Sequence, residues 1–233
     1  MGIGMGFFYG YDPYILLLIP AFLFSLYAQF RVKSVFAKYR NVPNTRGITG
    51  AQVAREILDS SGLHDVGVNS VQGELTDRYD SRTRTISLSS AVFSSTSVAS
   101  LGVAAHEAGH AIQHGTGYKP LILRSALGPV AGIGSSIGPY LAIFGLIIGL
   151  TPLIDVGIAA FSVAVLFYLI TLPVEFNASA RAISILGSTG ILSYDELAPA
   201  KKVLRAAAMT YLAAALVAVA SLLRLVLLSN RRR

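Results

Sequence analysis

Two histidines and a glutamate form the part of the chain best suited to chemistry. Residues 106–110 read HEAGH, an instance of the pattern H-E-x-x-H. On a helix, His106 and His110 lie four residues apart on one face, so both imidazoles can bind one tetrahedral zinc ion. Glu107 lies beside them and is placed to take a proton from a water that the metal activates. The motif therefore predicts a hydrolytic zinc site.

A catalytic zinc site needs a third protein ligand besides the two histidines. No histidine stands at the metzincin spacing, because Thr116 occupies that position. Glu175 is the strongest candidate, since an isolated carboxylate in the apolar segment LPVEFNAS needs a metal, a partner or a proton. Two predicted membrane spans separate His110 from Glu175, so both return to the same side of the membrane. His64, His114 and the other acidic residues remain alternatives.

The elements that must position these residues follow from local patterns. Small and apolar residues before and after HEAGH predict a helix that Gly115 ends. An earlier helix is predicted by apolar residues at helical spacing after a capping box at Thr49–Gln52. Between these helices the pattern changes to a period of two, which predicts short strands. The expected elements are helices 48–63 and 97–114 and strands 76–79 and 85–88. Strand 85–88 is predicted to offer its edge to an extended peptide.

The composition is that of a membrane protein. Of the 233 residues, 53% are hydrophobic and only 13% are charged, against about 25% charged in soluble domains. The chain has no cysteine, which excludes disulfides, thiol nucleophiles and cysteine metal ligands. Four apolar segments have the length of a membrane span. They are residues 14–30, 129–150, 154–172 and 209–228.

The distribution of charge predicts how the chain crosses the membrane. The formal net charge is +7, and the basic residues cluster beside the apolar spans, which favours lipid headgroups over nucleic acid. Lys and Arg are dense in 31–128 and 173–208, so the positive-inside rule places both segments in the cytoplasm. The basic tail Arg231–Arg233 disagrees, because four spans leave it outside. We expect a multi-pass protein of the cell (inner) membrane.

These observations together predict one fold class for residues 1–233. It is a mainly α membrane protein with about four transmembrane helices. The spans carry a small α+β zincin-like metallopeptidase domain on the cytoplasmic side. The HEAGH helix lies in segment 31–128, and the candidate third ligand lies in segment 173–208.

Two longer segments and three shorter ones match a known family. The longer ones are HEAGHAIQH at 106–114 and LPVEFNAS at 172–179, and the shorter ones lie at 47–51, 75–80 and 200–204. With these segments the chain resembles the bacterial YugP-like integral membrane neutral zinc metallopeptidases, over nearly its whole length.

The resemblance implies a gluzincin in which His106, His110 and Glu175 bind Zn²⁺ and Glu107 is the general base. In better-known related membrane gluzincins, an aspartate four residues after the ligand glutamate orients the first histidine. Here that position is Ser179. A hydroxyl can accept the imidazole N–H, but it adds no negative charge.

Four further residues are candidates for supporting roles. His114 and Tyr79 could stabilise the oxyanion of a transition state, although a histidine at a helix C-terminus is more often structural. Asn177 and Arg181 flank the candidate ligand and could hydrogen-bond to substrate or to a ligand. Packing at the membrane surface explains them equally well.

The expected function is hydrolysis of peptide bonds in a peptide or membrane-protein substrate next to the lipid bilayer. The alternative is a non-catalytic membrane scaffold or assembly factor with a structural or decayed metal site. A fourth protein ligand, such as His64 or His114, would indicate that alternative. A metal transporter is disfavoured because none of the four histidines lies in a predicted span.

Overall fold

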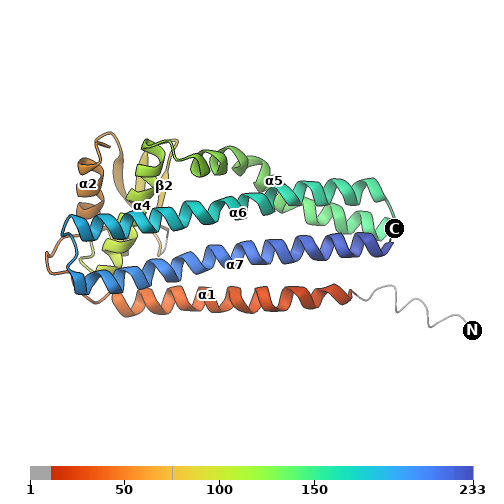
Figure 1. Cartoon of the computed structure of the whole chain (residues 1–233), viewed down its shortest axis with the longest axis horizontal. Helices are drawn as coiled ribbons and strands as arrows, with labels where there is room; N and C mark the ends of the chain where they lie inside the picture. Colours follow the sequence, from red (N-terminus) through yellow and green to blue (C-terminus); the bar gives the residue numbers. More distant parts are fainter. Residues whose placement is uncertain (1–11, 75, 233) are drawn as a thin grey trace, which may run out of the picture. The chain divides into compact units, whose positions relative to one another are not determined.

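The structure is a computed structural model that describes residues 12–74 and 76–232. The last residue of the predicted basic tail, Arg233, lies outside this range. A short 3₁₀ turn, Pro13–Leu17, leads into the first of four long helices. These are α1 (Leu18–Tyr39), α5 (Lys119–Ile148), α6 (Thr151–Ser188) and α7 (Tyr194–Arg232) (Figure 1). In the described part of the chain, four helical segments are long and apolar enough to cross a membrane.

Most of each predicted span falls on one of these four helices, and the first, 14–30, begins in the 3₁₀ turn before α1. The span predicted at 129–150 overruns α5 slightly, because Gly149 adopts a φ of +73° after the helix ends. Helix α6 continues through Pro173 without a break, so the predicted span 154–172 and the segment that follows it form one helix. Which of these residues lie within the bilayer stays a prediction.

The chain divides into two compact units. The first contains residues 12–27, 126–169 and 213–232 of the described chain. Within it, glycines allow α5 and α6 to pack closely, since a Cβ added at Gly138 would lie 2.9 Å from the carbonyl oxygen of Gly157. Arg224 of α7 pairs with Asp12 at 2.5 Å, which ties the start of the described chain to α7.

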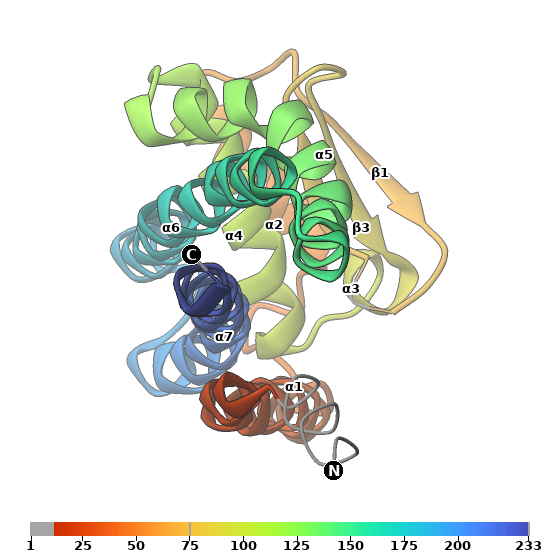
Figure 2. The same cartoon turned by 90° about the vertical axis from the view of Figure 1, so that its right-hand side faces the viewer.

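The second unit contains residues 28–125 and 170–212 and includes a three-stranded sheet. Its strands are β1 (Gly67–Val71), β2 (Arg78–Asp80) and β3 (Thr85–Ser89), in the order β1-β3-β2. Strand β3 pairs in parallel with β1, beside which it runs in Figure 2, and antiparallel with β2. The sequence predicted β2 and β3 but not β1. The expectation that strand 85–88 offers a free edge is wrong, because β3 is the central strand and both its edges are paired.

Three shorter helices complete the second unit: α2 (Gly50–Ser60), α3 (Ser90–Phe93) and α4 (Val98–Gly115). The predicted capping box is present, since the Thr49 side chain accepts from the Gln52 backbone and the Gln52 side chain accepts from the Thr49 backbone. The predicted HEAGH helix is α4, whose N-cap is Ser97. Helix α2 therefore begins where its capping box predicts, and α4 begins within one residue of the predicted start at residue 97.

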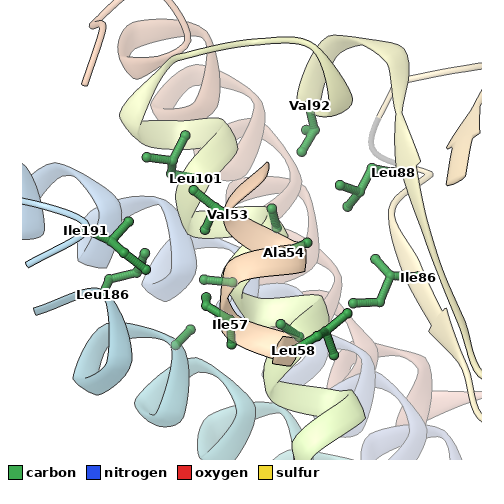
Figure 3. Close-up of a cluster of buried hydrophobic side chains, with 14 of the residues drawn as sticks. Val53, Ala54, Ile57, Leu58, Ile86, Leu88, Val92, Leu101, Leu186 and Ile191 are labelled. Atoms are coloured by element: carbon green, nitrogen blue, oxygen red, sulfur yellow. The ribbon is translucent and has the colours of Figure 1, made fainter. Parts of the chain in front are cut away.

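The core of the second unit surrounds α2. Ile57 and Leu58 of α2 are fully buried, and Figure 3 shows them among side chains from the sheet and from neighbouring helices. Each such side chain contributes about 1.5–3 kcal/mol through burial. Because Leu101 of α4 belongs to the same cluster, this core fixes the position of the helix that carries the HEAGH motif.

Candidate metal centre

Three side chains from two helices converge inside the second unit. His106 and His110 come from α4, and Glu175 comes from α6. The Glu175 Oε2 atom lies 3.3 Å from His106 Nε2 and 3.5 Å from His110 Nε2. The three potential ligand atoms all lie within 4.8 Å of one another. Each of the three therefore directs a donor atom toward one point.

This arrangement fits a zinc ion. Zinc bonds to nitrogen and oxygen are about 2.0–2.1 Å long, and a tetrahedral angle between them separates the ligand atoms by about 3.3 Å. The two distances to Glu175 Oε2 are close to that separation, and all three ligand atoms lie within 4.8 Å of one another. Two imidazoles and a carboxylate are also a ligand set that catalytic zinc sites use. The donor set can therefore hold the ion and leave one position open.

A glycine explains how the two helices come close enough. A Cβ added at Gly109 would lie 2.8 Å from the carbonyl oxygen of Ala178 on α6, closer than side-chain carbons approach in folded proteins. Only a residue without a side chain permits this spacing of α4 and α6. Because Gly109 precedes His110 and Ala178 follows Glu175 by three residues, the close approach occurs at the site itself.

The ring nitrogens that face away from the site have their own partners. His106 Nδ1 lies 3.1 Å from Ser179 Oγ, and His110 Nδ1 lies 3.0 Å from Gln113 Oε1. If each Nδ1–H donates to its oxygen, each Nε2 lone pair is left for a cation. The serine that stands where related gluzincins have an aspartate thus lies within hydrogen-bond distance of the first histidine.

Gln113 links one histidine to α6. Its side chain is fully buried, and its Nε2 donates to the carbonyl of Val174 at 2.8 Å and to Asn177 Oδ1 at 3.0 Å. The same Asn177 oxygen accepts from Arg181 Nε at 2.8 Å. Asn177 and Arg181 therefore connect to His110 through Gln113, a residue that the sequence interpretation did not single out.

Arg124 and Tyr211 also reach the candidate third ligand. Arg124 of α5 places Nη1 3.0 Å from Glu175 Oε1, the oxygen that faces away from the histidines. Tyr211 of α7 also lies near Glu175. The sequence analysis missed both residues. Nothing in their local sequence marks them, because their role depends on how α5 and α7 pack against α6.

Glu107 lies beside the convergence point and is 7% exposed. Burial raises the pKa of its carboxyl above the ordinary value, although the nearby imidazoles act in the opposite direction. A carboxylate whose pKa is raised holds a transferred proton more readily. For His110, burial alone would lower the pKa, but the hydrogen bond that the protonated ring donates to the Glu175 carboxylate and the negative charges of Glu107 and Glu175 outweigh burial and raise the pKa.

The similarity of the chain to known proteins agrees with the geometry of the site. Residues 14–230 match the model of a family described as "Putative neutral zinc metallopeptidase". The chain belongs to this family. It is 48% identical over 215 residues to the Bacillus subtilis (strain 168) protein named "Putative membrane protease YugP", covering 92% of this chain and 96% of the relative. No solved structure matches. The resemblance inferred from the motifs is thereby confirmed.

The remaining candidate residues of this zinc metallopeptidase family member lie apart from the ligand group. Tyr79 of β2 and His114 of α4 pair with each other, with the Tyr79 hydroxyl 2.8 Å from His114 Nδ1. His64 is 74% exposed and lies beside Asp59. Among the residues that the structure describes, neither histidine joins the group that can hold a metal. The fourth ligand that would indicate a closed structural site is therefore not found there.

Proposed function

We propose that the protein is a membrane zinc metallopeptidase that cleaves peptide bonds in peptides or membrane proteins. The observation that carries this proposal is the convergence of two histidines and one carboxylate beside a buried glutamate of the same helix. In this proposal His106, His110 and Glu175 are the three zinc ligands and Glu107 is the general base. The family membership supports the choice of metal and of reaction class.

When zinc is bound, it supplies a Lewis acid that acidifies a water molecule and polarises a carbonyl group. The protein residues then have separate tasks. Glu107 takes the proton of the attacking water and passes it to the leaving amine, and its raised pKa suits both steps. Ser179 and Gln113 hold the two imidazoles in the orientation that exposes each Nε2.

The distribution of Lys and Arg along the chain supports a cytoplasmic position for the proposed site. All the ligand residues belong to the second unit, whose residues 28–125 and 170–212 coincide closely with the predicted cytoplasmic segments. We therefore place peptide cleavage on the cytoplasmic side of the cell membrane. Substrates that reach the site from the cytoplasm or from the adjacent bilayer are the class expected.

The substitution Glu107→Gln tests the proposed base. It retains the shape of the side chain but cannot take a proton, so we expect peptide cleavage to fall by at least about 10²-fold. The zinc content, measured by elemental analysis, is expected to stay near that of the parent protein. Cleavage of a casein-type substrate at the full rate would show that Glu107 is not the base.

Two companion variants complete that experiment. Glu175→Ala removes a proposed ligand, so the zinc content is expected to fall together with activity. Glu74→Gln is the matched control, because this glutamate side chain is 76% exposed and lies in a loop; both activity and zinc content should be unchanged. Unaltered zinc stoichiometry in the Glu175→Ala protein would remove this residue from the ligand set.

A further inference from the structure

The second unit has a groove between α6 and α7. Of the residues placed in the proposed metal site, Ser179 lines this groove. Its volume is about 740 Å³. Apolar side chains form most of its lining, among them Phe176, Ile183, Leu204, Ala208, Met209 and Leu212. We refer to it as the α6/α7 groove. A cavity of this size falls in the range of small-molecule sites.

The polarity of the groove changes along its length. Lys201 and Arg205, one helical turn apart on α7, line one end together with Ser184 of α6. Both basic side chains belong to exposed residues, and no ion pair in the described part of the chain uses either of them. The groove therefore has positive charge without an ion-pair partner at one end and an apolar lining beyond it. This arrangement suits an amphiphile with an anionic head.

The apolar end lies where the predicted membrane spans begin. Met209 is the first residue of the predicted span 209–228, and Phe176 follows the predicted span 154–172 by one helical turn. The basic end therefore lies toward the polar side of the membrane surface, and the apolar end lies toward the acyl chains. A phospholipid presents its phosphate and its acyl chains in this same order.

The lining disfavours a peptide as the occupant. Both walls are α-helices whose backbone groups already bond within the helix, so an extended peptide would find few partners for its own N–H and C=O groups. A peptide helix is about 10 Å wide. An acyl chain needs no hydrogen bonds and is narrower.

We propose that the α6/α7 groove is a binding site for an anionic phospholipid. The phosphate lies at Lys201 and Arg205, where the guanidinium can donate two parallel hydrogen bonds. An acyl chain lies along Ile183, Ala208 and Leu212. Ser179 lines the groove and also lies 3.1 Å from His106 Nδ1, so the bound lipid contacts a residue that orients a proposed zinc ligand. The proposal does not depend on peptidase activity.

Fluorescence quenching tests this site directly, because the chain contains no tryptophan. The variant Leu212→Trp places one fluorophore at the apolar end of the groove. The full-length protein is reconstituted in phosphatidylcholine vesicles that contain increasing fractions of brominated phosphatidylglycerol or brominated phosphatidylcholine. We expect half-maximal quenching at a mole fraction about fivefold or more lower for the brominated anionic lipid, since each basic side chain favours it by about that factor.

Two further variants assign that preference to the groove. In the double variant Lys201→Gln with Arg205→Gln, the two brominated lipids should reach half-maximal quenching at about the same mole fraction. Lys202→Gln is the matched control, because this exposed neighbour does not line the groove, and it should retain the preference. If Leu212→Trp disrupts folding, Met209→Trp reports on the same end.

Three results would overturn the proposal. The first is equal quenching by both lipids in the reporter protein. The second is a preference that survives the double substitution or disappears equally with Lys202→Gln, which would indicate general attraction at the membrane surface. The third is relief of quenching by a hydrophobic peptide at a stoichiometric amount, which would make the groove a peptide site.

Discussion

Gln113 holds a proposed zinc ligand and the backbone of a neighbouring helix at once. Its Oε1 faces His110 Nδ1, and its Nε2 donates to Val174 and Asn177. An amide is the side chain that can accept on one side and donate twice on the other. Fixing the imidazole in this way selects the ring nitrogen that is free to bind a cation.

Replacing Gln113 by Leu should therefore weaken metal binding without touching a ligand. We expect zinc affinity, measured by competition with a chromophoric chelator, to fall by about 10–100-fold. Buried polar atoms of His110 and Val174 also lose their partner, which lowers the free energy of unfolding by about 1–3 kcal/mol. The same substitution at Gln72, whose side chain is exposed, should change neither quantity. An unchanged affinity in Gln113→Leu would mean that the amide does not orient His110.

Ser179 offers a graded test of how His106 is held. The variant Ser179→Ala removes the oxygen beside His106 Nδ1, and zinc affinity should fall. The variant Ser179→Asp supplies a charged acceptor that raises the basicity of the imidazole, so its affinity should equal or exceed that of the parent. Competition with a chromophoric chelator gives the order of zinc affinity for the parent protein and the two variants. Equal affinities in all three would show that position 179 does not act on the metal site.

At the scale of elements, the close approach of α4 and α6 depends on one glycine. Gly109→Ala places a methyl group 2.8 Å from the carbonyl oxygen of Ala178, so the helices must separate and His110 must move away from Glu175. We expect a loss of zinc affinity and a fall of about 1–3 kcal/mol in the free energy of unfolding, measured by denaturant titration in detergent.

A second glycine of α4 provides the control for that substitution. A Cβ added at Gly102 would lie 3.5 Å from the Ala200 Cβ, an ordinary packing distance. Gly102→Ala should therefore be neutral, or stabilise α4 by up to about 1 kcal/mol through helix propensity. If both variants lose zinc equally, the tight contact at Gly109 is not what positions the ligands.

The elements differ in how far the sequence could predict them. Helices α2 and α4 follow from a capping box and from the HEAGH context, and both appear in the structure. Strand β1 has no regular alternation of buried and exposed residues. It is an edge strand, and its partner β3 lies further along the chain. Its existence depends on that pairing, which no local pattern contains.

The site shows the same limit. Ser179 could be anticipated from the resemblance, because related gluzincins place an aspartate at this position, four residues after the ligand glutamate. The spacing of Gln113, three residues after His110 on α4, also permitted its contact with that histidine, but Gln113 was not singled out. The contacts of Arg124 and Gln113 with α6 could not be anticipated, since each meets α6 from another element. Spacing along one helix is visible in a sequence, whereas the partner that a second helix brings depends on packing.

At the scale of the whole molecule, the absence of cysteine makes the predicted topology testable. Ser188 and Thr151 stand at opposite ends of α6, and both are exposed. The positive-inside rule places Ser188 in the cytoplasm and Thr151 outside. In membrane vesicles, a membrane-impermeant maleimide should label Ser188→Cys only when they are inverted and Thr151→Cys only when they are right-side-out.

The C-terminal end of α7 is the weak point of that topology and can be tested in the same assay. With four spans, Asn230→Cys should be labelled from the outside like Thr151→Cys, in spite of the arginines that follow it. Labelling of Ser188→Cys and Thr151→Cys from the same side would contradict a crossing by α6. Labelling of Asn230→Cys from the cytoplasm would contradict a crossing by α7.

Glu175 stands on a helix of 38 residues that also contains the predicted span 154–172. A slide of that helix by one residue moves the carboxylate by about 1.5 Å, whereas a zinc–oxygen bond accommodates only about 0.2 Å. Helices tilt or slide when the hydrocarbon layer around them becomes thinner or thicker, and Pro173, which cannot donate to Leu169, is a natural bending point. The length of the surrounding acyl chains is therefore expected to influence how tightly the ion is held.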